Sequence, residues 1–353
     1  MKERDLSLDF FRGIAAISVI FIHTVFWSGG SYVPEIFRTV ALLVDVPFFI
    51  FLSGWSMNYS SKLPRIFTNL LKIWFHWILF ISLIDLFCFF AFKNHITKSV
   101  WVKQIFFAVG NSIPNFPVIN GSLWFMPMYV MVSICGGVFI NFWNLINIDR
   151  RKCFYIVAFL LIGLTYISIG LGNTWFFLSR TVCFYLSAFI IGWYAPQIKI
   201  KNFIQYVVIL LGIIILWFLI SRFFCIPAKN LQSAKFPCHI MYFAASLLSF
   251  FTSIFFRDRM NFCEKNKVLE CIQGGVIHIG RNAICFYFAQ GVGSSVIFHF
   301  TKYSQVYGWK FTLLVCFGLN VIITILIAVF LILIFRFADI GIKKISGLYH
   351  ECF

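Results

Sequence analysis

The stretch FFRGIAAISVIFIHTVFWSGG, Phe10 to Gly30, is apolar over about 20 residues, the length that crosses the hydrocarbon core of a bilayer. It also contains two ionisable side chains, Arg12 near its start and His23 well inside it. An ionisable group within a membrane costs free energy, so its presence there indicates a function. The stretch therefore predicts a membrane-spanning helix that contributes to a site.

Apolar blocks of this kind recur along the chain, which has 353 residues, of which 61% are hydrophobic and 12% are charged. Short polar or basic connectors separate the blocks, as in a bundle of membrane-spanning helices. A membrane barrel would instead alternate in hydropathy over segments of about ten residues. We predict an all-α polytopic membrane protein, a bundle of about ten transmembrane helices at residues 10–29, 36–57, 67–92, 121–141, 153–172, 178–196, 204–224, 239–256, 280–300 and 311–335.

No hydrophilic stretch is long enough for a second soluble domain, so we expect a single membrane domain over residues 1–353, with its first block retained as a helix. The formal net charge is +17, but the basic residues are dispersed among connectors and span ends, which does not suit nucleic acid. With the N-terminus inside, most Lys and Arg residues fall on the cytoplasmic side. An even number of spans then places both termini in the cytoplasm.

Arg12 and His23 are expected to lie on one face of the first helix. Eleven residues are almost three helical turns and about 16 Å along the axis. An Arg at the cytoplasmic end suits the phosphates of a donor, because its guanidinium forks onto phosphate oxygens. His23 suits a general base on a hydroxyl or amine. Because His23 lies towards the outer half, a cavity must lead the donor most of the way through the membrane.

Other ionisable or reactive side chains have simpler explanations. His76, four residues after Lys72, is expected to pack in the interior, and Asp85 is expected to pair with an interior Arg or a hydroxyl. Cys225 and Cys238 bracket a connector placed outside the cytoplasm and are candidates for a disulfide. No Cys or His spacing suits zinc or an iron-sulfur cluster, so no metal is expected.

The motifs resemble those of the integral membrane acyltransferase 3 family. In LDFFRGIAAISVIFIH, Arg12, Gly13 and His23 match its first-helix signature, an Arg-Gly in which ten residues separate the Arg from a following His. DVPFFIFLSGW, residues 45–55, is similar to its second-helix run of an acid, two aromatics and Ser-Gly. Later segments agree in order through Arg65 in KLPRIFTNLLKIWF, Trp124 in NGSLWFMPMYV, and Gly280, Asn282 and Tyr287 in IGRNAICFYFAQG. The resemblance covers residues 6 to 336.

The resemblance implies a membrane O-acyltransferase, a stand-alone membrane domain in the bacterial inner membrane. It would move an acyl group, expected to be acetyl, from cytoplasmic acetyl-CoA to a hydroxyl of a cell-surface or lipid-linked polysaccharide such as lipopolysaccharide O-antigen. The cofactor-binding residues would be Arg12 and Arg65, which would hold the phosphates of the donor. His23 would be the catalytic base, with a transient acyl-His as a variant.

The remaining motif residues are assigned less specifically. Asp45 is expected to pair with Arg12, Arg38 or His23, and as a partner of His23 it would orient the imidazole. Ser53, Trp124 and Tyr287 are assigned to substrate contact or to packing, because a Ser-Gly in a helix commonly marks a close helix contact. Where the family often has a His, three residues after the late Tyr, this chain has Gln290, to which no role is given.

Two other classes of function remain open. The chain would be a transporter or exporter of saccharide or acyl groups if His23 and Asp45 formed a proton relay. It would be an assembly partner in a polysaccharide complex if it had no chemistry of its own. A transporter needs no coenzyme A, so acyl transfer by the purified protein distinguishes the enzyme from both.

Overall fold

The structure, a computed structural model, describes residues 5–27, 32–59, 63–94, 96–106, 113, 115–122, 124–170, 174–236, 238–260, 267–304 and 307–351. These residues form helices and turns without strands. The α-helices are α1 (Leu6–Trp27), α2 (Glu35–Ala41), α3 (Val46–Ser56), α4 (Leu63–Phe92), α5 (Lys98–Ile105), α6 (Pro117–Ser122), α7 (Phe125–Leu145), α8 (Cys153–Gly170), α9 (Thr174–Tyr194), α10 (Phe203–Phe223), α11 (Ile240–Arg257), α12 (Lys267–Arg281), α13 (Ala283–Ser304) and α14 (Trp309–Glu351). Short 3-10 turns are η1 (Arg150–Lys152), η2 (Ala195–Gln197) and η3 (Leu231–Ala234).

The predicted fold class is confirmed. Within the described residues, 8 helical segments are long and apolar enough to cross a membrane. The other two predicted spans, 153–172 and 178–196, coincide with α8 and α9. The chain is an all-α, multi-pass membrane protein.

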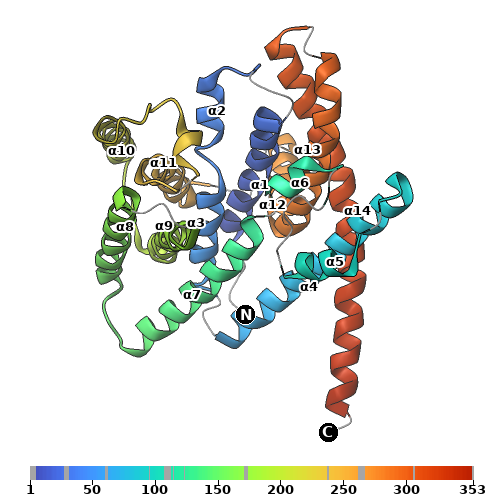
Figure 1. Ribbon diagram of the computed structural model, residues 1–353. Helices are drawn as coiled ribbons and strands as arrows, with labels where there is room; N and C mark the ends of the chain where they lie inside the picture. The colour runs from blue at the N-terminus through green and yellow to red at the C-terminus, as the bar shows by residue number, and fades with distance from the viewer. Residues whose placement is uncertain are drawn as a thin grey trace.

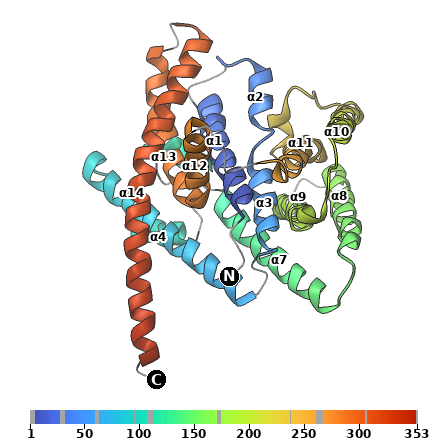
Figure 2. The same cartoon turned by 180° about the vertical axis from the view of Figure 1, so that it is seen from behind.

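Helix α1 occupies the middle of the bundle, where it packs against α3, α12, α13 and α14 (Figure 1). Helices α8, α10 and α11 lie together on one flank, and α4 and α14 lie on the opposite flank, as Figure 2 also shows from behind. The long α14 extends beyond the rest of the bundle at its C-terminal end (Figure 1). Residues of α1 are therefore surrounded by other helices.

The predicted span 36–57 is made of two helices, α2 and α3, with a break between them. The break falls at Asp45-Val46-Pro47, where Asp45 has extended backbone angles (φ −126°, ψ −161°) and Pro47 lies in the first turn of α3. Proline has no N–H to donate, so it suits the first turn of a helix. The break places the Asp45 carboxylate and the N-terminal end of α3 inside the bundle, because Asp45 is only 3% exposed.

Helix α12 departs from the prediction, which treated the residues before 280 as a connector. It packs along α1 at the Arg12 end. A side chain at Gly13 would clash with the Val276 carbonyl, and one at Gly280 would clash with the Asp9 carbonyl. Small residues allow this close approach of two helices within a membrane. Helix α12 therefore covers one face of α1 at the Arg12 end.

Candidate functional site

The start of α1 is held by Asp5. Its carboxylate accepts a hydrogen bond from the Leu8 N–H (3.1 Å), as a helix-capping carboxylate does, and another from the Tyr59 hydroxyl (2.6 Å). Burial, together with the bond to Asp5, raises the pKa of Tyr59 to about 12. The phenol is therefore protonated at neutral pH and remains a donor, and the first turn of α1, which precedes Arg12, has a defined position.

A cavity of about 250 Å³ lies beside Arg12. Its wall is built from α1, α3, α4, α7, α12 and α13. The lining residues that bear polar groups are Arg12, Ser53, Tyr129, Arg281 and Tyr287. Two guanidinium groups thus face one cavity near the N-terminal end of α1.

Asp9 links these two guanidinium groups. Its carboxylate is 2% exposed and lies 3.8 Å from Arg12 Nη1 and 3.4 Å from Arg281 Nε. Side-chain exposure is 29% for Arg12 and 46% for Arg281. One carboxylate between two permanent cations leaves the group with a formal charge of +1, which suits an anionic ligand such as phosphate.

A second, smaller cavity of about 30 Å³ lies beside His23. Its polar lining comes from His23, Asp45, Ser122, Trp124 and Lys235, together with Tyr287. In the described part of the chain the buried His23 Nδ1 has no hydrogen-bond partner. The imidazole is therefore held by packing in a cavity that also contains a carboxylate and an ammonium group.

Three aromatic residues, Phe49, Phe125 and Tyr287, line both cavities. Their ring centroids are 6.3 Å apart for Phe49 and Phe125, and 5.1 Å apart for Phe125 and Tyr287. The Tyr287 hydroxyl donates to the Ser122 carbonyl (2.7 Å), which fixes the ring between the two spaces. The Arg12 and His23 cavities are thus neighbours along α1, separated by a partition of three aromatic side chains.

Asp45 has partners that the sequence did not indicate. Its Oδ2 accepts hydrogen bonds from Lys235 Nζ (2.6 Å) and from the Tyr242 hydroxyl (2.5 Å). The predicted pairing with Arg12, Arg38 or His23 is wrong for the described residues. A buried carboxylate needs a cation within hydrogen-bonding distance. The connector before α11 brings the Lys235 ammonium to Asp45, so the two pair. Asp45 therefore positions Lys235, and not the His23 ring.

The other predicted site residues divide into two sets. Trp124 lines the His23 cavity, Ser53 lines the Arg12 cavity, and Tyr287 lines both. Arg65 lies on the exposed first turn of α4 and lines neither cavity. Gln290 is buried on α13, and neither of its amide atoms has a hydrogen-bond partner among the described residues.

The three simpler assignments have mixed outcomes. His76 is buried as predicted, 3.1 Å from Asp339, which also pairs with Lys72 (2.5 Å). Asp85 accepts from the Gln104 amide of α5 (3.5 Å), so its partner is neither an Arg nor a hydroxyl. No disulfide joins Cys225 and Cys238 in this structure. Among the described residues, no group of three His, Cys, Asp or Glu side chains is placed to hold a metal ion.

Sequence reasoning missed Asp9, Lys235 and Tyr242 as members of the site, and gave Arg281 no role. Lys235 lies in the connector before α11, and its local sequence does not distinguish it from the other basic residues in connectors. Arg281 was visible as an ionisable residue at a span end, and its position next to Gly280 of the late motif was the available signal. The contact of α12 with α1, which brings Arg281 to Asp9, has no local sequence pattern.

The geometry combines an anion-binding pair of guanidinium groups, a neighbouring imidazole in a cavity, and an ammonium group beside it. Such a set suits group transfer from a phosphate-bearing donor within a membrane bundle. A family model described as an acyltransferase domain matches residues 5–336, nearly the whole chain. The chain belongs to this family, acyltransferase 3, and is a membrane acyltransferase. Neither the curated proteins nor the solved structures contain a match.

Proposed function

We propose that the protein transfers an acetyl group from cytoplasmic acetyl-CoA to a hydroxyl of a cell-surface or lipid-linked saccharide. Both termini lie in the cytoplasm, so the Arg12 cavity opens to the donor side. Membership of the acyltransferase family supports the reaction type. The single observation that carries the proposal is that α1 presents Arg12 and His23 to two neighbouring cavities with a shared wall.

The Arg12 cavity fits one part of the donor. At about 250 Å³ it is at the small end of ligand pockets. The cavity therefore binds the narrow thioester arm of the donor, while Arg12 and Arg281 bind a phosphate group at the edge of the cavity. For the thioester to reach His23, the partition of Phe49, Phe125 and Tyr287 must move aside.

His23 acts as the general base in the proposed reaction. It accepts the proton of the acceptor hydroxyl as that oxygen attacks the carbonyl carbon of the thioester. The C–S bond then breaks, and coenzyme A leaves as the thiol after taking the proton from His23. Between attack and C–S cleavage, negative charge develops on the thioester carbonyl oxygen. The Lys235 ammonium, which Asp45 and Tyr242 position, stabilises this charge.

The proposal is tested with purified protein in vesicles, labelled acetyl-CoA and a saccharide acceptor. We expect His23→Ala to lower kcat by about 10²- to 10⁴-fold, the usual contribution of a general base. Arg12→Ala and Arg281→Ala should each raise the KM for acetyl-CoA about 10- to 100-fold, because each removes a charged hydrogen bond. Lys235→Met should lower kcat about 10²- to 10³-fold.

Matched controls come from exposed basic residues that line neither cavity. Arg222→Ala, in the last turn of α10, should leave the KM for acetyl-CoA unchanged, and Lys229→Met, 71% exposed, should leave kcat unchanged. The double variant Asp45→Asn/Lys235→Met removes both charges and keeps the interior free of an unpaired ion. Wild-type acyl transfer by His23→Ala contradicts the assignment of the base. Saccharide movement across the vesicle without acyl transfer would instead identify a transporter.

A further inference from the structure

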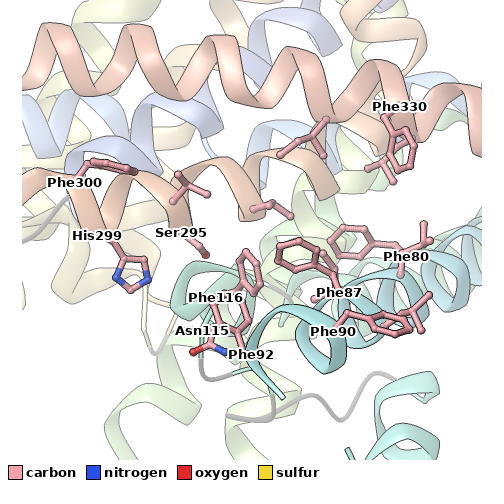
Figure 3. Close-up of a pocket in the computed structure, with 17 residues that line it drawn as sticks. Phe80, Phe87, Phe90, Phe92, Asn115, Phe116, Ser295, His299, Phe300 and Phe330 are labelled. Atoms are coloured by element: carbon pink, nitrogen blue, oxygen red, sulfur yellow. The ribbon is translucent and has the colours of Figure 1, made fainter. Parts of the chain in front are cut away.

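A large apolar cavity lies away from the candidate site. It is a groove of about 870 Å³ between α4, α13 and α14, and it is closed at one end by Asn115 and Phe116, just before α6. Seven of its lining residues are Phe, and Figure 3 shows these rings along its length. In a membrane-spanning bundle an apolar groove of this size takes a hydrocarbon chain, because a chain is the apolar ligand that a bilayer supplies.

The groove is polar at one end only. Figure 3 shows Asn115 and His299 together at one end, and Phe80, Phe90 and Phe330 towards the other. Within the described residues, neither the Asn115 amide nor the His299 imidazole makes a hydrogen bond to another residue. Both groups are donors that suit phosphate or sugar oxygens. The groove therefore fits an amphiphile with one long chain and a polar headgroup.

The polar end of the groove adjoins the candidate site through α6. Ser295, on the groove wall, accepts a hydrogen bond from the Val118 N–H at the start of α6 (3.1 Å). Ser122, the last residue of α6, lines the His23 cavity. Four residues of helix span about 6 Å. A headgroup held at Asn115 and His299 is thus one short helix away from the candidate base.

We propose that this groove binds the hydrocarbon chain of a lipid-linked acceptor, a saccharide joined through phosphate to a long chain. The inference rests on the proposed acyl transfer and specifies its acceptor. The chain lies along the Phe-lined wall, the phosphate accepts hydrogen bonds from Asn115 and His299, and the sugar extends past α6 towards His23. Anchoring the chain raises the effective concentration of the sugar hydroxyl at the site.

The test compares two acceptors in vesicles of phosphatidylethanolamine and phosphatidylglycerol: a polyisoprenyl-phosphate saccharide and the same saccharide without the chain. Val296→Phe fills the groove, and Asn115→Leu/His299→Leu removes its polar end. Val296→Phe should raise the KM for the lipid-linked acceptor about tenfold, as expected when roughly two methylene groups lose their burial. Asn115→Leu/His299→Leu should raise it about tenfold as well, because the hydrogen bonds to the charged phosphate are lost. The KM for the soluble saccharide should not change. Val329→Phe, a lipid-facing position of α14 outside the groove, is the matched control.

Two outcomes of this comparison overturn the proposal. If the variants affect both acceptors equally, the groove only supports the fold. If they affect neither, the groove takes ordinary phospholipid only.

A second measurement does not depend on acyl transfer. A polyisoprenyl-phosphate saccharide with a photoreactive diazirine in its chain should label residues 80–92 and 292–300. Unlabelled polyisoprenyl-phosphate saccharide should compete with this labelling, excess phosphatidylglycerol should not, and Val296→Phe should reduce it. Equal competition by phosphatidylglycerol overturns the proposal. If wild-type protein transfers acetyl to neither acceptor while the labelling stays specific, the proposed function fails and the lipid site stands.

Discussion

At the scale of single residues, Gln290 is a buried polar side chain whose amide is unsatisfied in the described part of the chain. It is 1% exposed, and neither amide atom has a hydrogen-bond partner within the described structure. An unsatisfied buried polar group costs about 1–3 kcal/mol, so Gln290→Met, which keeps the shape and removes the polarity, should stabilise the protein by about that amount. Thermal unfolding of the detergent-solubilised protein measures the effect as a higher midpoint.

Asn320 provides the matched control for Gln290. It is fully buried, and its amide donates to the Thr24 hydroxyl (2.9 Å) and to the Ser294 hydroxyl (2.9 Å). Asn320→Leu should therefore lower the midpoint, because it leaves these hydroxyl groups without their donor. The two substitutions should act with opposite signs. A lower midpoint for Gln290→Met would show that its amide is paired.

The residues of the site differ in how far sequence alone could predict them. Arg12 and His23 lie on one helix, so helical periodicity was enough to place them on one wall. Asp45 and Lys235 are 190 residues apart, and their contact depends on how a connector folds back over α3. No periodic pattern encodes such a contact. Sequence reasoning therefore found the two groups on α1 and missed the ammonium group beside them.

At the scale of helices, the backbones of α3 and α9 approach each other closely at two glycines. A Cβ at Gly54 would clash with the Phe189 carbonyl, and one at Gly192 would clash with the Phe51 carbonyl. Gly54→Ala should therefore separate the helices and destabilise the protein by about 1–3 kcal/mol, as overpacking does. Because α3 also bears Asp45, kcat for acyl transfer should fall as well. Unfolding midpoints and the transfer assay measure the two effects.

Gly212, on α10, is the control for this prediction. A Cβ at that position would meet nothing within 4 Å. Gly212→Ala should be neutral or stabilising by up to about 1 kcal/mol, because Ala is the better helix former. If Gly54→Ala and Gly212→Ala behave alike, helix propensity and not the contact with α9 governs both positions.

The elements were easier to predict than their interruptions. Apolar length alone located the 8 described helical segments that can cross a membrane, since a bilayer requires about 20 apolar residues in succession. The same criterion treated 36–57 as one helix, although Asp45-Val46-Pro47 was a local signal for a new helix start. It gave no reason to expect α12 against α1, because that contact depends on Gly13 and Gly280, which are far apart in sequence and meet only in the folded bundle.

For the whole molecule, the orientation in the membrane decides whether the Arg12 cavity faces the donor. The positive-inside rule predicts that both termini, and with them the Arg12 end of α1, face the cytoplasm. Two native cysteines can test this orientation, because it predicts that they face opposite sides of the membrane. Cys225 is an exposed thiol in the connector between α10 and α11, and Cys271 is an exposed thiol on α12, the helix that packs along α1.

A membrane-impermeant maleimide therefore tests the orientation in sealed vesicles. Because an exposed thiol reacts only from the side that it faces, Cys225 should be modified in right-side-out vesicles and Cys271 in inside-out vesicles. Peptide mass spectrometry identifies the modified thiol, and Cys225→Ser and Cys271→Ser show that each signal comes from its own residue. Modification of Cys271 in right-side-out vesicles would show that the orientation of the bundle is the reverse of the one predicted. The guanidinium pair at Asp9 would then face away from cytoplasmic acetyl-CoA, and the donor proposed for this cavity would be wrong.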